Sequence, residues 1–331
     1  MHTLNCLVAL PFALLVLSAC PTSEKVGGNP SEASDSDSSA SETATSAGSS
    51  SGTTETEPTT TDTEPTTTDT EPATGSTTIV PDGPPSECGP PCDATWTHVG
   101  ELVISGSSLS STDDFKCMTR VVGGLQIYDL DPQQLSGLRN LVSVEGNLAI
   151  LSETLTDLSP FSCLEEVTEQ LQLGSAPNLT DVSGLSALRH TQRFLMLNTG
   201  ATAVPTFSPE FSGLSSAQIE SNDALVDLAA MANWKADEAG VGVLIQDNLA
   251  LKSVAGLKPL LASGPMSGTS VDLSNLPALE SLAGLEGLTE PFAISLQALP
   301  SIPDLAPLGQ LKRADFLELS GMPLIKDLQG L

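Results

Sequence analysis

The chain has 331 residues, of which 41 are acidic and 12 basic, and its formal net charge is -29. This balance excludes nucleic-acid binding through a basic surface, because phosphates need Lys and Arg nearby to release their counterions. Only 3% of the residues are aromatic and 3 are His, which leaves little material for a metal site or a base-assisted nucleophile. We therefore expect no catalytic residue, no metal and no cofactor.

Residues 6–19 form an almost unbroken apolar run, CLVALPFALLVLSA, and Cys20 follows it directly. As a helix this run would rise about 21 Å, which is shorter than the roughly 30 Å hydrocarbon core of a bilayer. The run therefore predicts a signal peptide over residues 1–19 rather than a membrane-spanning helix.

The sequence Leu17-Ser18-Ala19-Cys20 resembles the lipobox of bacterial lipoproteins. The resemblance implies that Cys20 carries lipid, becomes the first residue of the mature chain and attaches it to the membrane of a bacterial cell envelope. Pro21 rather than Asp follows the cysteine, which favours the outer membrane or cell surface. Residues 1–5 carry no Lys or Arg, which departs from the lipoprotein pattern. An ordinary secretory signal with an incidental cysteine is the alternative.

Residues 21–87 are dominated by Ser, Thr, Glu, Asp, Pro and Gly. They contain 13 acidic residues and one basic residue, Lys25. Within them TETEPTT, TDTEPTT and TDTEPAT follow one another without a gap over residues 54–74. Such a segment cannot bury enough apolar surface to offset the entropy of ordering it. We predict a disordered tether over residues 20–87, about 45 Å from end to end, that lifts the folded part off the membrane. Drifted low-complexity sequence without a selected length is the alternative.

From about residue 88 the composition changes, and ten short segments of the form apolar, any residue, apolar recur. Their last residues are 23, 23, 23, 24, 22, 26, 28, 23 and 23 positions apart. Such a period is typical of a solenoid, in which each turn buries its apolar side against the next turn. The ten predicted strand segments are Leu102–Ile104, Leu125–Ile127, Leu148–Ile150, Leu171–Leu173, Leu195–Leu197, Ala217–Ile219, Val243–Ile245, Val271–Leu273, Ile294–Leu296 and Leu317–Leu319.

A second motif recurs between the strands: LTDL at 155–158, LTDV at 179–182, LVDL at 225–228, LESL at 279–282 and IKDL at 325–328. The spacing, together with LTDLSPFSCLEEVTEQLQL and LTDVSGLSALRH, resembles the receptor L-domain family over residues 95–331. This resemblance implies a right-handed, leucine-rich-repeat-like parallel solenoid, mainly β with short helical or irregular turns. An internalin-type leucine-rich repeat is the competing interpretation, but only Asn222 and Asn248 occupy its asparagine position. Members of the L-domain family bind proteins or peptides without catalysis.

We expect a cap with the first strand over residues 88–120 and the solenoid over residues 121–331. Residues 325–331 begin a further turn and stop before its strand. That turn leaves apolar edges uncovered, so we expect either a chain truncated at this point or another group that covers the end.

Once Cys6 and Cys20 are assigned to the signal and the lipid, Cys88, Cys92, Cys117 and Cys163 remain. Cys117 and Cys163 occupy the same position two turns apart, about 9.6 Å along the stack, whereas a disulfide requires Cα atoms within about 7 Å. We therefore predict that Cys88 or Cys92 bonds Cys117 and caps the N-terminal end, and that Cys163 is a buried thiol.

Side chains alternate between the two faces of a strand, so the central residue of each segment and the residue after its end face outward. The result is a polar, Gln-rich and mildly acidic sheet face with a few apolar points, which is either a shallow recognition surface or an ordinary solvated face. The candidate contact residues are Gln126, Tyr128, Gln172, Met196, Gln218, Leu244, Asp272 and Glu318.

The two longest intervals contain Trp234 and residues 263–270, which we predict to be loops on one side of the stack. Trp234 is either an exposed contact residue or a plug packed against the solenoid.

These features together predict a surface-anchored, non-catalytic recognition or adhesion module. Its partners are the membrane, through the lipid, and an unidentified extracellular or periplasmic protein, peptide or glycan. A structural spacer without a ligand and a β-helical glycan-active enzyme are the alternatives. The enzyme is disfavoured because the basic residues are scattered and the outward acids are isolated, whereas such catalysis needs charged groups that converge on one groove.

Overall fold

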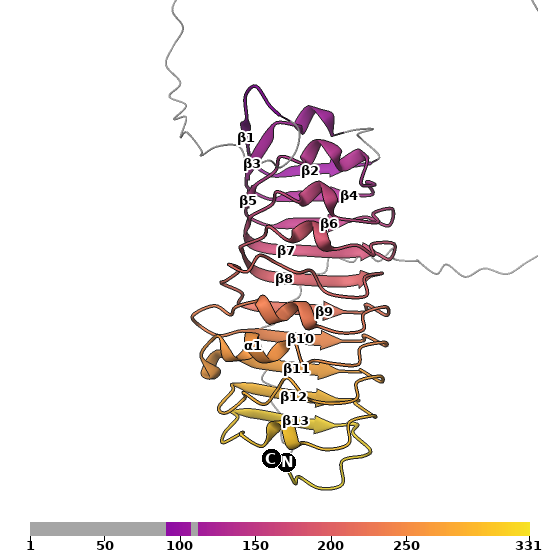
Figure 1. Cartoon of the computed structure of the whole chain (residues 1–331), viewed down its shortest axis with the longest axis vertical. Helices are drawn as coiled ribbons and strands as arrows, with labels where there is room; N and C mark the ends of the chain where they lie inside the picture. Colours follow the sequence, from indigo (N-terminus) through magenta and orange to yellow (C-terminus); the bar gives the residue numbers. More distant parts are fainter. Residues whose placement is uncertain (1–90, 107–111) are drawn as a thin grey trace, which may run out of the picture. The chain divides into compact units, whose positions relative to one another are not determined.

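The computed structural model describes residues 91–106 and 112–331 (Figure 1). The predicted signal peptide, the lipid-bearing Cys20, the tether and Cys88 lie outside these described residues. No helix in the described ranges is long and apolar enough to cross a membrane.

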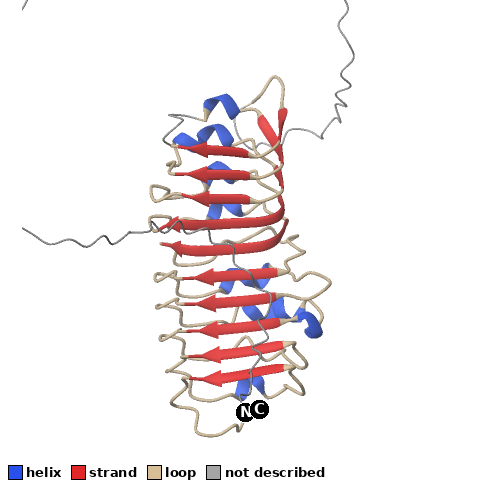
Figure 2. Cartoon of the chain, turned by 180° about the vertical axis from the view of Figure 1, so that it is seen from behind, coloured by secondary structure: helices blue, strands red, loops and turns tan. Residues whose placement is uncertain are grey.

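The described chain folds into a solenoid whose strands form one long parallel sheet (Figures 1 and 2). Ten strands stack in chain order and all of them pair in parallel. This confirms the mainly β, parallel solenoid expected from the repeat. The ten strands are β2 (Leu102–Ser105), β4 (Leu125–Tyr128), β6 (Leu148–Leu151), β7 (Glu166–Ala176), β8 (His190–Thr199), β9 (Ser216–Glu220), β10 (Gly242–Gln246), β11 (Ser270–Ser274), β12 (Ala293–Gln297) and β13 (Phe316–Ser320).

The sheet register corrects one predicted strand. Met196 is 0% exposed and pairs with Leu173 on one side and Ile219 on the other, so it points into the core. Phe194, two positions earlier on β8, is buried as well, and Leu195 and Leu197 face outward. The prediction failed because Leu195, Met196 and Leu197 are all apolar, and such a triplet fits either phase of the alternation. With Met196 as the strand marker, the intervals of 24 and 22 positions both become 23.

A second, shorter ladder lies beside the first in the N-terminal turns. It is formed by β1 (Trp96–Val99), β3 (Met118–Val122), β5 (Ser143–Glu145) and the first residues of β7 and β8. Gly100, Gly123 and Gly146 mark the bend between the ladders with φ of 111°, 132° and 149°. A Cβ at Gly123 would collide with the carbonyl of Gly100, and one at Gly146 with that of Gly123, so this column requires glycine. β7 and β8, which have 11 and 10 residues, run through the bend as single curved strands (Figure 2).

Short helices fill the turns opposite the sheet, and the recurring Leu-x-Asp-Leu motif explains their starts. The carboxylates of Asp157, Asp181 and Asp227 each accept a hydrogen bond from the backbone N–H two residues later, at 2.9–3.0 Å. These bonds satisfy amides that the helix itself leaves free. The helices are η1 (Asp113–Phe115), η2 (Gln134–Leu138), η3 (Ser159–Phe161), η4 (Ser183–Leu185), η5 (Ala229–Asn233), α1 (Leu257–Ala262), η6 (Met266–Gly268) and η7 (Ala306–Leu308).

The two longest turns lie between β9 and β11. The second contains α1 and η6, which protrude from one side of the stack (Figure 1). In the first, Trp234 is 1% exposed, stacks on Phe207 with ring centroids 4.6 Å apart, and meets Phe194 edge-on at 5.2 Å. Trp234 is therefore a core residue of the solenoid, which decides between the two alternatives for it.

Asn222 and Asn248 form a short buried ladder behind the strands. The side-chain amide of Asn222 donates to the carbonyls of Met196 and Glu220, and its carbonyl accepts from the backbone N–H of Thr199. Asn248 repeats the pattern one turn later by donating to the carbonyls of Ile219 and Gln246. The ladder joins three turns, whereas Leu276 and Leu299 fill the same position with apolar packing.

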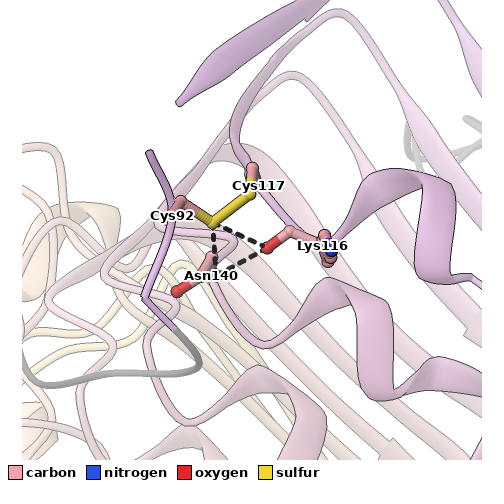
Figure 3. Close-up of a disulfide and its surroundings, with 4 residues drawn as sticks. All are labelled: Cys92, Lys116, Cys117 and Asn140. Carbon is pink, nitrogen blue, oxygen red and sulfur yellow. Dashed lines mark hydrogen bonds between the residues drawn. A yellow bond between two sulfur atoms is a disulfide. The ribbon is translucent and has the colours of Figure 1, made fainter. Parts of the chain in front are cut away.

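A disulfide between Cys92 and Cys117 ties the segment before β1 to the turn before β3, with a Cα–Cα distance of 5.7 Å (Figure 3). Of the two predicted partners for Cys117, Cys88 and Cys92, the structure pairs Cys92. The side-chain amide of Asn140 donates to the carbonyl of Lys116 at 2.5 Å and lies 3.4 Å from the Cys92 sulfur. Cys163 is buried outside this disulfide, as its position two turns from Cys117 implied.

The disulfide should contribute substantially to stability. Because it closes a loop with a sequence separation of 25, Cys92→Ser and Cys117→Ser should each lower the free energy of unfolding by about 3 kcal/mol. Urea unfolding followed by circular dichroism measures this change. Dithiothreitol should destabilise the wild type to the level of the variants and leave the variants unaffected. Equal stability of the oxidised wild type and both variants would contradict the assignment.

Candidate binding face

The outward side of the ten-strand sheet, called the outward face below, carries two columns of side chains that run through all ten strands. The pairing register aligns each column across the whole sheet. The first column contains Val103, Gln126, Ala149, Gln172, Leu195, Gln218, Leu244, Asp272, Ser295 and Glu318. The second contains Ser105, Tyr128, Leu151, Gly174, Leu197, Glu220, Gln246, Ser274, Gln297 and Ser320. A third column runs through β7 to β13 only and contains Gln170, Arg193, Ser216, Gly242, Ser270, Ala293 and Phe316.

Seven of the eight predicted contact residues lie on the outward face, and all seven are partly exposed: Gln126, Tyr128, Gln172, Gln218, Leu244, Asp272 and Glu318. The eighth, Met196, is wrong because it lies in the core. Leu195 occupies the position that the prediction gave to Met196. The candidate contacts omitted Leu151, although the residue after each segment was expected to face outward. They also omitted Leu197, although the uniform 23-residue spacing around Met196 was a signal for the correct phase of β8.

Ala149, Leu151, Gly174, Leu195 and Leu197 form a continuous apolar area on β6, β7 and β8, called the aliphatic patch below. Leu151, Gly174 and Leu197 are direct neighbours in one column. A Cβ on Gly174 would lie 2.9 Å from Cδ2 of Leu151, so the leucine side chain leans over the glycine backbone. Apolar groups that touch one another on a polar surface are typical of interaction sites.

Polar side chains around the patch pair along their own strands. On β4 the hydroxyl of Tyr128 donates to the side-chain carbonyl of Gln126 at 2.5 Å. On β7 the side-chain amide of Gln170 donates to the side-chain carbonyl of Gln172 at 3.3 Å. On β9 the amide of Gln218 donates to the carboxylate of Glu220. These pairs hold the polar side chains flat along the sheet and leave the leucines as the unpaired surface between them.

Asp272 on β11 is the most perturbed acid of the outward face. Burial raises the pKa of its carboxyl above the ordinary value, the hydroxyls of Ser295 and Ser274 lower the pKa, and the negative charge of Glu318 raises it further. Its Oδ1 atom is buried and has no hydrogen-bond partner among the described residues. Asp247, at the end of β10, shows the opposite case: hydrogen bonds from Asn275 and Gln246 lower the pKa of its carboxyl. Asp272 thus carries a charge that its surroundings stabilise poorly.

Other features of the described surface are weaker candidates for a binding site than the outward face. A hollow of about 390 Å³ lies on the turns and is lined by Asp131, Arg139, Thr156 and Asp157, among others. Within residues 91–106 and 112–331, no three His, Cys, Asp or Glu side chains gather closely enough to hold a metal ion. The outward face is therefore the candidate site.

No protein-family model matches the chain, and no curated protein matches it either. The functional proposal consequently rests on the fold and on the outward face.

The corrected register of β8 gives adjacent residues opposite roles. Met196→Ala should lower the free energy of unfolding by about 2–4 kcal/mol, because it leaves a cavity in the core. Leu195→Ala, on the neighbouring outward position, should lower it by about 1 kcal/mol or less. Urea unfolding of the two variants measures the difference. A larger loss for Leu195→Ala would show that the predicted phase, not the observed one, is correct.

Proposed function

We propose that the chain is a non-catalytic recognition module whose outward face binds a macromolecule at a bacterial cell surface. The observation that carries this proposal is the aliphatic patch on β6–β8. The leucines of the patch are half-buried. When a partner covers them, they lose their remaining contact with water, at about 25 cal/mol per Å² of apolar surface removed. A spacer without a ligand has no use for such a patch.

The regular stack supports this proposal because it makes the outward face rigid. Every outward side chain projects from a strand that is paired in parallel with its neighbours, and the inward columns are buried from β4 to β12. A surface fixed before binding loses little conformational entropy when a partner docks on it. The receptor L-domain resemblance points the same way, since its members bind proteins or peptides through a solenoid.

The N-terminal residues supply the proposed location. The apolar run ending at Leu17-Ser18-Ala19-Cys20 supports a lipoprotein attached through Cys20, with Pro21 favouring the outer membrane or cell surface. The acidic Ser/Thr/Pro segment that follows supports a tether between the lipid and the folded module.

A binding screen separates recognition from a purely structural role. The full chain should bind at least one member of a panel of defined surface proteins, peptides and glycans. Gln172→Glu combined with Leu195→Glu should abolish that binding, because it places two charges at the centre of the face. The exposed Val226, outside the outward face, provides the control variant Val226→Glu, which should bind normally. A chain that binds nothing is a spacer, and binding that survives the double change does not use the outward face.

Lipid attachment is tested separately. Cells expressing the chain and grown with radiolabelled palmitate should label it, and Cys20→Ser should remove the label, because no other residue of the LSAC sequence offers a thiol. Cys163→Ser serves as the control and should keep the label. Label retained by Cys20→Ser would rule out the anchor while leaving the recognition face untouched.

A further inference from the structure

The outward face is asymmetric in charge along the stack. From β9 to β13 its first two columns contain three carboxylates, on Glu220, Asp272 and Glu318, and no Lys or Arg. Arg193, exposed on β8 beside the aliphatic patch, pairs with Ser216 on β9 and therefore lies at the edge of this acidic half. An approaching chain with basic side chains is therefore favoured over β9–β13 rather than over Arg193.

Asp272 is the centre of the acidic half. Its neighbours in the same column are the uncharged Leu244 and Ser295, and Glu318 follows on β13. Since neighbouring parallel strands are about 4.8 Å apart, the Cα atoms of Asp272 and Glu318 lie about 10 Å apart with the short Ser295 between them. Ser295 is 8% exposed, and its hydroxyl accepts a hydrogen bond from the side-chain amide of Gln297. A Lys or Arg that approaches above this pair faces both carboxylates.

The aliphatic patch and the acidic half touch each other at β8 and β9. Leu197 pairs with Glu220, and Leu195 with Gln218, in the sheet register. Leu244 continues the apolar character two strands further, directly beside Asp272. A partner that covers the patch consequently places its flanking residues over carboxylates.

The same composition disfavours a glycan. Two aromatic residues lie on the outward side of the ten strands: Tyr128 on β4, whose hydroxyl already donates to Gln126, and Phe316 on β13, at the opposite end of the stack. Sugar rings therefore find few aromatic surfaces to stack on. Aliphatic side chains beside carboxylates instead match a polypeptide.

We propose that the outward face binds a polypeptide segment that presents aliphatic side chains to the patch on β6–β8 and a Lys or Arg to Asp272 and Glu318. This inference rests on the proposed recognition function and names the chemical class of the partner. The leucines supply the anchor, and the carboxylates set the orientation of the segment and its preference for basic residues.

The test uses the full chain and an array of short synthetic peptides in four compositions: Leu with Lys, Leu with Glu, Ser with Lys and Ser with Glu. The Leu–Lys peptides should bind about tenfold tighter than each of the other three sets, measured by fluorescence anisotropy. Leu197→Ser should weaken this binding about tenfold, the effect of losing one partly covered leucine. Leu249→Ser makes the same change at a side chain that is 48% exposed on the turn after β10, and should leave binding unchanged.

The role of the carboxylates is read from selectivity. Asp272→Asn should reduce the preference for Leu–Lys over Leu–Glu peptides about threefold, while Asp223→Asn, at an exposed loop carboxylate, should preserve it. Thermal unfolding of every variant confirms that the fold is intact. Because Asp272→Asn removes a poorly stabilised charge, it should not lower stability.

Three results would overturn the inference: no peptide binds, Leu–Lys peptides bind Leu197→Ser as well as the wild type, or Asp272→Asn leaves the selectivity unchanged. These outcomes are distinct from failure of the recognition function. If the panel described above identifies a glycan that binds the outward face while no peptide does, recognition stands and the assigned partner class is wrong.

Discussion

Every feature of this solenoid depends on the burial of an apolar strip that no single turn can cover by itself. Ile294 on β12 is 0% exposed because β13 lies over it, whereas Leu317, at the same position on β13, is 41% exposed. The difference between these two residues is the contribution of one neighbouring turn. Stacking is therefore the source of stability, and the parallel hydrogen bonds of the sheet set the distance at which the turns repeat.

This constraint divides the chain into positions that must be apolar and positions that can carry other side chains. Inward residues such as Ile127, Leu173 and Met196 have to be apolar, while the outward residues have only to tolerate water. Glutamines and carboxylates at these outward positions are unsurprising. Apolar outward residues require a reason, above all where Leu151, Leu195 and Leu197 gather around Gly174, and contact with a partner supplies one.

The turns absorb variation without disturbing the sheet. The interval that contains α1 is 28 residues long, five more than the common 23, yet Gly242 still pairs with Ser270 and Leu244 with Asp272. The insertion protrudes from the side of the stack, so the outward face remains continuous from β8 to β13. A continuous face is what allows the aliphatic patch and Asp272 to act on the same partner.

The sequence alone determined the architecture, because burial and strand alternation are local rules that repeat with the 23-residue period. The same rules limited the cysteine pairing, since two turns place Cys117 too far from Cys163. These rules could not predict which residues of β8 face inward, because three consecutive apolar residues satisfy either alternation. Only the pairing of Met196 with Leu173 and Ile219 decides which side is buried. The packing of Trp234 on Phe207 and the pairing of Gly174 with Leu151 and Leu197 likewise join residues that are far apart in the chain. Such contacts are decided by how the turns lie on one another in three dimensions, which no local pattern encodes.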